Sequence, residues 1–333
     1  VYPGTYTIGV GGDVIDNGSQ WMVKDGVTLY MMPGAIIQYT TNTGTIGTDL
    51  SLPFTDGGLA HTFIIRGKGQ FIFAADTTDA TVPDYFNLTG NVGTTVDWEF
   101  DKITIKRRFG GPYSELPKFS SWRMVGREYI NTESGIFQFE LPPESPNISI
   151  DIDIENVTIT YTNGAKAVWT VNKLFNLSTG SIVNIRYGKV SYPNAISAGG
   201  FHENDTCDKY SVINLTIDNI TRTGTDSYTD FFVYHNTDTS KGTYTIKNIN
   251  TKKGLIKSDS ATGVEACRTA YLQGNIYTNG GGVGNYMMHF DTTNVHYKIE
   301  LDIVHNGTSG YDLGIYAKDS WQVKISGYLK WAN

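Results

Sequence analysis

The feature that most constrains the fold is a short unit that recurs along the chain. In each unit a strand-like segment is followed by one small or polar residue and a second strand-like segment, as in WEFDKITIK, IDIENVTIT and LTIDNITRT. We call the central residues pivots, and they are Gly34, Gly69, Lys102, Asn156, Lys189, Asn219, Asn248, Gly274, Asp302 and Gly327. Successive pivots are 25 to 35 residues apart, except for one step of 54 residues. A recurring unit of this length indicates a solenoid rather than two globular domains.

The residue types at the pivots predict a bend between two strands. Glycine and asparagine tolerate the left-handed conformation of a tight bend, whereas the lysine and aspartate pivots tolerate it less well. A second column supports the repeat, because an aromatic residue followed by Asn precedes several units, as in Phe86-Asn87 and Phe175-Asn176. Stacked units would pair in parallel, with apolar ladders inside and Asn side chains bonded along a corner. We therefore predict an all-β fold, a single right-handed parallel β-helix of about ten coils over residues 1–333.

Composition and charge exclude several classes of partner. Charged residues make up only 18% of the chain and the formal net charge is −7, with no basic stripe interleaved with aromatic residues. Binding to nucleic acid is therefore not expected. No apolar stretch approaches the roughly 20 residues that cross a bilayer, so we expect no membrane insertion. The six histidines are scattered and form no zinc motif, and we predict no metal or other cofactor.

The longest step, from Lys102 to Asn156, predicts a long inserted loop at about residues 106–136. Its segment KFSSWRMVGREYI places Trp122, Val125 and Tyr129 at helix-like spacing. This spacing predicts the one short helix of the chain.

Aromatic and basic side chains in the same segment suit a glycan ligand. Aromatic faces stack on sugar rings, and Arg side chains bind carboxylates or hydroxyls with a planar fork of donors. Tyr113, Trp122, Arg123 and Arg127 are therefore candidate ligand-binding residues. The alternative is that Trp122 and its neighbours pack the loop over the coil or against another subunit, and both interpretations stay open.

A second candidate site is the polar cluster in FHENDTCDKY, together with DFFVYHNTD one unit later. Hydrolysis of a glycoside usually needs two carboxylates, about 5 Å apart for retention or roughly 6.5 to 9.5 Å for inversion. Side chains of one column lie about 4.8 Å apart on neighbouring coils, and stacked carboxylates raise one another's pKa. Glu203, Asp205 and Asp238 are therefore candidate catalytic residues. The alternative is that Asn and Asp at the corners form Asx turns and ladder bonds.

The opening residues, VYPGTYTIGVGGDVIDNGSQWMVKDGVTLYMMPGAIIQY, resemble the first coil of pectin-lyase-like β-helix proteins, and IIRGKGQFIF resembles the second. This superfamily includes pectate lyases, polygalacturonases, alginate and chondroitin lyases and bacteriophage tailspikes. The Asn-, Thr- and Tyr-rich composition and irregular coil length are most similar to tailspikes and receptor-binding spikes. Of four motifs typical of polygalacturonases, the chain has only the Asn-Thr-Asp at residues 236–238. The resemblance implies a fold and leaves the reaction open.

The resemblance to spikes implies a virion surface protein that recognises host cell-surface polysaccharide, located extracellularly or on the virion, and commonly a homotrimer. The alternative is a polysaccharide lyase or glycoside hydrolase, and the second alternative is a passive structural shaft. The last unit, WQVKISGYLKWAN, leaves a strand edge to be covered. We therefore expect further sequence or a partner subunit there, and anchoring or targeting segments outside the sequence that starts at Val1.

Overall fold

The computed structural model describes the backbone of part of the 333-residue chain. The described residues are 4–9, 28–41, 62–75, 86–87, 94–106, 112–114, 119–131, 137–140, 147–159, 172–175, 180–192, 202–205, 210–222, 232–234, 240–251, 256–258, 265–278, 288–290, 293–305, 315–317, 323–326 and 329–331. Side chains are described for residues 28–37, 64–72, 95–104, 121–130, 147–159, 180–191, 210–221 and 240–248.

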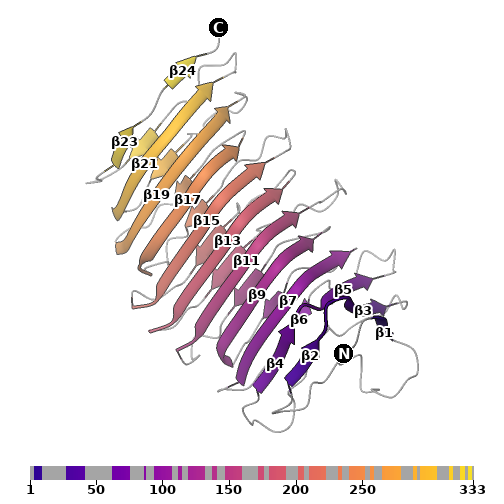
Figure 1. The fold of residues 1–333 in the computed structure, drawn as a ribbon. Helices are drawn as coiled ribbons and strands as arrows, with labels where there is room; N and C mark the ends of the chain where they lie inside the picture. Colours follow the sequence, from indigo (N-terminus) through magenta and orange to yellow (C-terminus); the bar gives the residue numbers. More distant parts are fainter. Residues whose placement is uncertain are drawn as a thin grey trace.

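Most strands belong to one long sheet, sheet A, whose strands lie side by side in chain order along an elongated stack (Figure 1). Its main path runs through β1 (Gly4–Gly9), β3 (Ala35–Thr41), β5 (Gln70–Ala75), β7 (Thr94–Lys106), β9 (Phe119–Asn131), β11 (Ser149–Ile159), β13 (Ile182–Tyr192), β15 (Val212–Arg222), β17 (Gly242–Thr251), β19 (Glu265–Thr278), β21 (Thr293–His305) and β23 (Val323–Ser326). Three further strands join it: β2 (Thr28–Met31), β4 (Thr62–Gly67) and β24 (Leu329–Trp331).

Sheet B is a second, narrower sheet. Its strands are β6 (Phe86–Asn87), β8 (Pro112–Ser114), β10 (Phe137–Glu140), β12 (Asn172–Phe175), β14 (His202–Asp205), β16 (Phe232–Tyr234), β18 (Ile256–Ser258), β20 (Met288–Phe290) and β22 (Ile315–Ala317). From β5 to β23 the chain alternates between the two sheets, and the pairings along both are parallel. The described residues are thus all-β, without a helix, which confirms the predicted class. Consecutive parallel strands in two open sheets are compatible with a solenoid.

Four of the pivots share one column of sheet A, whereas Gly274 pairs with Ile249 and Leu301, and Asp302 pairs with Asn275. One column joins Lys102, Glu128, Asn156, Lys189 and Asn219 on consecutive strands. The pivot residue on β9, Glu128, is neither Gly nor Asn. We call each strand of the main path of sheet A, with the chain that leads to the next such strand, a rung. The single step of 54 residues therefore contains two rungs of ordinary length rather than one.

The expected left-handed backbone occurs at some pivots and not at others. Gly34 and Asn248 adopt it, with φ of 82° and 48°. Gly69 has a different cause, because a Cβ there would lie 2.4 Å from the Cβ of Met31. At this pivot it is lack of space, rather than backbone conformation, that requires glycine.

A break in side-chain alternation produces the bend at the pivot column. Along β11, inward and outward residues alternate up to Ile154, after which Glu155 and Asn156 both lie outside and Val157 is buried again. We call such a pair of successive outward residues the corner. It recurs on the neighbouring strands as Asp101-Lys102, Arg127-Glu128, Gly188-Lys189 and Asp218-Asn219.

Asparagine side chains bond the corner of one rung to the corner of the preceding rung. The Nδ2 of Asn156 donates to the backbone carbonyl of Arg127 at 3.3 Å, and that of Asn219 donates to the carbonyl of Gly188 at 3.3 Å. Asn248 repeats the bond to a third carbonyl, at 3.0 Å. The predicted ladder of Asn hydrogen bonds is therefore confirmed for these three residues, and each bond satisfies a corner carbonyl.

Inward side chains stack into apolar columns behind sheet A. Trp98, Trp122, Tyr129, Tyr187, Tyr244 and Phe71 are the largest fully buried side chains. Trp98 meets the ring of Phe71 edge-on, with centroids 5.0 Å apart. Column neighbours complement one another in size, since Phe100 pairs with Gly126 and its ring fills the space a Cβ there would take. Such complementary packing stabilises the stack.

The segment predicted to form a helix is strand β9, and that prediction is wrong. Trp122, Met124 and Gly126 face the core in strict alternation, and after the corner Tyr129 is the next inward residue. Val125, the middle residue of the helix-like spacing, lies between the buried Met124 and Gly126 and therefore faces outward. Of the loop predicted at about 106–136, β8 and β9 are strands of the two sheets and β9 is a full rung.

Candidate functional site

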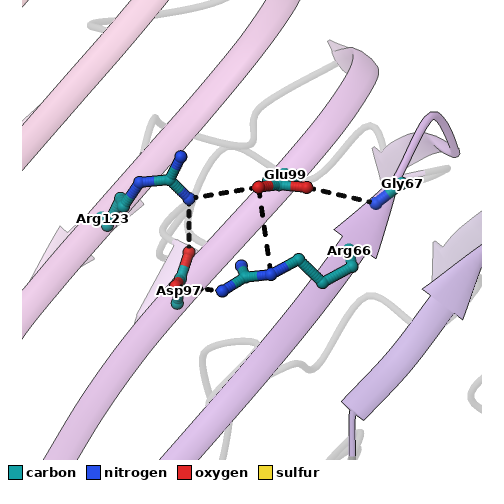
Figure 2. Close-up of polar contacts among 5 residues, drawn as sticks. All are labelled: Arg66, Gly67, Asp97, Glu99 and Arg123. Atoms are coloured by element: carbon teal, nitrogen blue, oxygen red, sulfur yellow. Dashed lines mark hydrogen bonds and ion pairs between the residues drawn. The ribbon is translucent and has the colours of Figure 1, made fainter.

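The outer face of sheet A, opposite the core, carries the most concentrated set of charged side chains among the described residues. Strand alternation turns Asp97 and Glu99 of β7 outward, because Val96, Trp98 and Phe100 between and beside them are buried. Arg66 on β4 and Arg123 on β9 flank them. Figure 2 shows the four side chains, which we call the ion network, converging from three strands.

Each carboxylate of the ion network contacts both arginines. Asp97 accepts from Arg66 Nη2 through Oδ2 at 2.5 Å and from Arg123 Nη1 through Oδ1 at 2.8 Å. Glu99 Oε1 lies 3.3 Å from Arg123 Nη1 and 3.9 Å from Arg66 Nε. Its Oε2 also accepts from the backbone N–H of Gly67 at 3.5 Å. The ion network therefore links three strands of the sheet, and its two arginines and two carboxylates balance in charge (Figure 2).

The electrostatic effect of this arrangement is clear at Asp97. Partial burial raises the pKa of its carboxyl, but the hydrogen bonds from Arg66 and Arg123 outweigh burial and hold that pKa below its usual value. The hydrogen bond to Asp97 raises the pKa of Arg66 in turn. Asp97 and Arg66 are therefore ionised at neutral pH. A pair with this degree of exposure contributes no more than about 1 kcal/mol.

The corner of β7 and β9 carries further ion pairs. Arg127 binds Asp101 with both ends of its fork, at 2.7 and 3.1 Å, which lowers the pKa of that carboxyl. Beside it, Lys102 Nζ lies 3.1 Å from Glu128 Oε2. Charges of opposite sign thus face one another across the two rungs.

The face changes character on the following rungs. Arg186 on β13 bridges Asp153 and Asp218, at 2.8 Å to each. Beside this bridge runs a chain of amides: the N–H of Thr243 donates to Asn214 Oδ1 at 3.1 Å, and Asn214 Nδ2 donates to Asn184 Oδ1 at 3.0 Å.

The structure separates the four predicted ligand-binding residues. Trp122 is only 1% exposed and lies in the core, so its ring offers no surface to a sugar. Arg123 and Arg127 lie on the outer face but are held by carboxylates of β7. Tyr113 lies on β8 of sheet B, and its side chain is outside the described set. Trp122 is buried on strand β9 within the stack, whereas the alternative interpretation placed it in a loop packed over the coil.

The predicted catalytic residues lie in sheet B or outside the described residues. Glu203 and Asp205 belong to β14, where Glu203 pairs with Lys173 and Val233 on the neighbouring strands. Asp205 pairs with Phe175. Neither of these pairings places a second carboxylate opposite Glu203 or Asp205. Asp238 and the side chains of β14 are outside the described residues.

Sequence reasoning missed the carboxylates of the ion network, although a signal exists. VDWEFD and IDIDIE each place three acidic residues at alternate positions, with apolar residues between them. In a half-buried strand this pattern puts three carboxylates on one outer face. The basic residues of the intervening RMVGRE segment then become their neighbours.

The described side chains of the outer face form ion pairs and hydrogen bonds with one another. In the part of the chain that the structure describes, no three His, Cys, Asp or Glu side chains are grouped so as to hold a metal ion. Within the same residues, no helix is long and apolar enough to span a membrane.

Comparison with known proteins finds no match among family models, curated proteins or solved structures.

Proposed function

We propose that the chain is a right-handed parallel β-helix and serves as a surface-recognition spike, of the virion type, that binds host cell-surface polysaccharide along the outer face of sheet A. The resemblance of the first two coils to pectin-lyase-like proteins, and of the composition to tailspikes, supports this proposal. An extracellular or virion-surface location and a homotrimer belong to the same proposal.

The observation that carries the proposal is the regularity of the outer face. Outward residues of successive rungs pair in straight columns, such as Asp151, Asn184 and Asn214. Each column repeats at the spacing of parallel strands, about 4.8 Å. A polymer of repeating sugar units presents hydroxyls at regular intervals, so a rigid face of repeating polar groups can bind several units without ordering a loop.

The proposal is tested by binding of the purified protein to an immobilised array of bacterial surface polysaccharides, read by biolayer interferometry. The double variant Thr216→Trp with Thr245→Trp places two large side chains on the outer face and should bind the polysaccharide at least tenfold more weakly. Both threonines are half-buried outward residues, so the indoles would project from the face. Circular dichroism checks that the variant is folded. Absence of binding to every polysaccharide would refute the proposal.

A passive shaft is the second candidate, and one observation favours it. Arg66, Arg123, Arg127 and Arg186, the arginines with described side chains, are all engaged by carboxylates of the chain itself. A face that satisfies its own charges needs no ligand. The array distinguishes the shaft, which binds nothing, from the spike.

The enzyme alternative rests on Glu203, Asp205 and Asp238, and the same polysaccharides test it. New reducing ends would indicate a hydrolase, whereas new absorbance near about 235 nm would indicate a lyase. Loss of either signal in Asp205→Asn or Asp238→Asn would assign the chemistry to these residues.

A further inference from the structure

The outer face of sheet A is divided into two chemically different parts. On β4, β7 and β9 it carries charged side chains bound to one another. On β13, β15 and β17 the outward residues include a group of amides and hydroxyls, which we call the amide patch: Asn184, Asn214, Thr216, Thr243 and Thr245. The two parts would select different ligands.

The ion-paired part is poorly suited to an acidic glycan. A sugar carboxylate that approached Arg123 would be repelled by Asp97 and Glu99, whose carboxylates lie 2.8 and 3.3 Å from its Nη1. The next rung, β11, then presents Asp151 and Glu155, both exposed. Repulsion from these carboxylates opposes an anionic chain that runs across the rungs.

The five residues of the amide patch offer hydrogen bonds without charge, and Arg186, the column partner of Thr216, is itself neutralised by Asp153 and Asp218. The N–H of Thr243 can only donate, so the oxygen of Asn214 faces Thr243 and its amide nitrogen faces Asn184. The bonds therefore run in one direction along the column. They leave the Nδ2 hydrogens of the exposed Asn184 without an acceptor among the described residues. Such a donor at the end of a polarised chain suits a hydroxyl oxygen.

On the basis of the proposed function, we infer that the polysaccharide is uncharged and rich in hydroxyls, and that it binds at the amide patch. Its hydroxyls accept from Asn184 Nδ2 and donate to the hydroxyl oxygens of Thr216 and Thr245 one and two rungs on. Specificity then comes from hydrogen bonds whose loss leaves polar groups unpaired, rather than from Arg forks.

The test compares three double variants on an array whose polysaccharides are sorted into uncharged members and members with uronic acids. Asn184→Ala with Asn214→Ala removes the amide chain and should weaken binding to an uncharged polysaccharide at least tenfold. Asn156→Ala with Asn219→Ala is the matched control, because it removes two amides from the corner and leaves the patch intact. Its affinity should stay within twofold of the parent protein, even if its melting temperature falls.

The third variant, Lys189→Ala with Lys247→Ala, tests whether the polysaccharide is instead acidic and bound by lysines. These exposed lysines are, with the exposed Lys241 just before β17, cations that an acidic chain near these rungs would use. We expect their loss to leave binding unchanged. Binding to uronic-acid members alone, or a larger loss in the lysine variant than in the amide variant, would overturn the inference while the proposed spike function stands. Failure of both sets of polysaccharides to bind would overturn the spike function as well.

Discussion

The contact between Phe100 and Gly126 makes a quantitative prediction about how rungs stack. The two residues pair directly across β7 and β9, and Gly126 is buried. A Cβ at Gly126 would lie 2.0 Å from Cε2 and 2.2 Å from Cζ of the Phe100 ring. These separations are far inside van der Waals contact, and the ring is enclosed, so it cannot swing away.

Gly126→Ala should therefore destabilise the protein through overlap alone. Its φ is outside the left-handed region, so alanine meets no backbone penalty there. Overpacking of this kind costs about 1–3 kcal/mol. Phe100→Ala should cost about 3–5 kcal/mol through the cavity it leaves. In that background the new methyl group occupies vacated space, and Gly126→Ala should become neutral or stabilising by about 0.5 kcal/mol.

The assay is a double-mutant cycle measured by urea unfolding with circular dichroism. Gly188→Ala is the matched control: its Cβ would lie 2.6 Å from the backbone oxygen of Glu155, which truncation of Phe100 cannot relieve. The loss of stability caused by Gly188→Ala should be the same in the parent protein and in Phe100→Ala. An equal cost of Gly126→Ala with and without Phe100 would refute the reasoning, because the overlap would then not be with the ring.

Three other predictions follow from the corner, the ion network and the core. In Lys189→Asn, the new Nδ2 should donate to the backbone carbonyl of Glu155, just as Asn219 Nδ2 donates to the carbonyl of Gly188 one rung later. The free energy of unfolding, measured by urea titration, should rise by about 1 kcal/mol. Because the folded pKa of Asp97 is lowered, its contribution is complete at neutral pH and is lost as the pH falls through the ordinary aspartate range toward the folded value. The stability difference between the parent and Asp97→Asn should therefore shrink between about pH 7 and pH 3, and a constant difference would contradict it. Trp122→Phe should leave polysaccharide affinity unchanged, since the indole is buried, and a large loss of affinity in a folded variant would place it at a binding surface.

The repeat of strands and pivots could be read from the sequence because the rungs from β7 to β17, whose side chains are described, follow one rule: alternate apolar residues, then two outward residues, then alternation again. The rung on β9 was missed because its corner is Arg127-Glu128, two charged residues without the Gly or Asn used to find the others. The helix was predicted from the spacing of Trp122, Val125 and Tyr129, but Val125 faces outward on β9, between the buried Met124 and Gly126. Only the pairing of β9 with β7 and β11 shows that the segment is a rung.

The candidate site was less predictable than the fold because its contacts join residues far apart in the chain. Arg66 and Asp97 are 31 residues apart, and Asp97 and Arg123 are 26 apart. Irregular loop lengths hide which residues share a column, so the sequence showed Arg123 and Arg127 as free cations in a loop. Their partners became apparent only from the register of three strands.

The same corner explains why the register is unique. In a strand of uniform alternation, a slip of two residues keeps every inward side chain inside and changes only the column partners. Across the corner this is no longer true, because a slip of two between β7 and β9 would set the inward Tyr129 beside the outward Asp101. The slip would therefore expose an aromatic ring or bury a carboxylate, and either change costs several kcal/mol. The corner thus fixes the stacking of the core and, as a consequence, which guanidinium meets which carboxylate on the outer face.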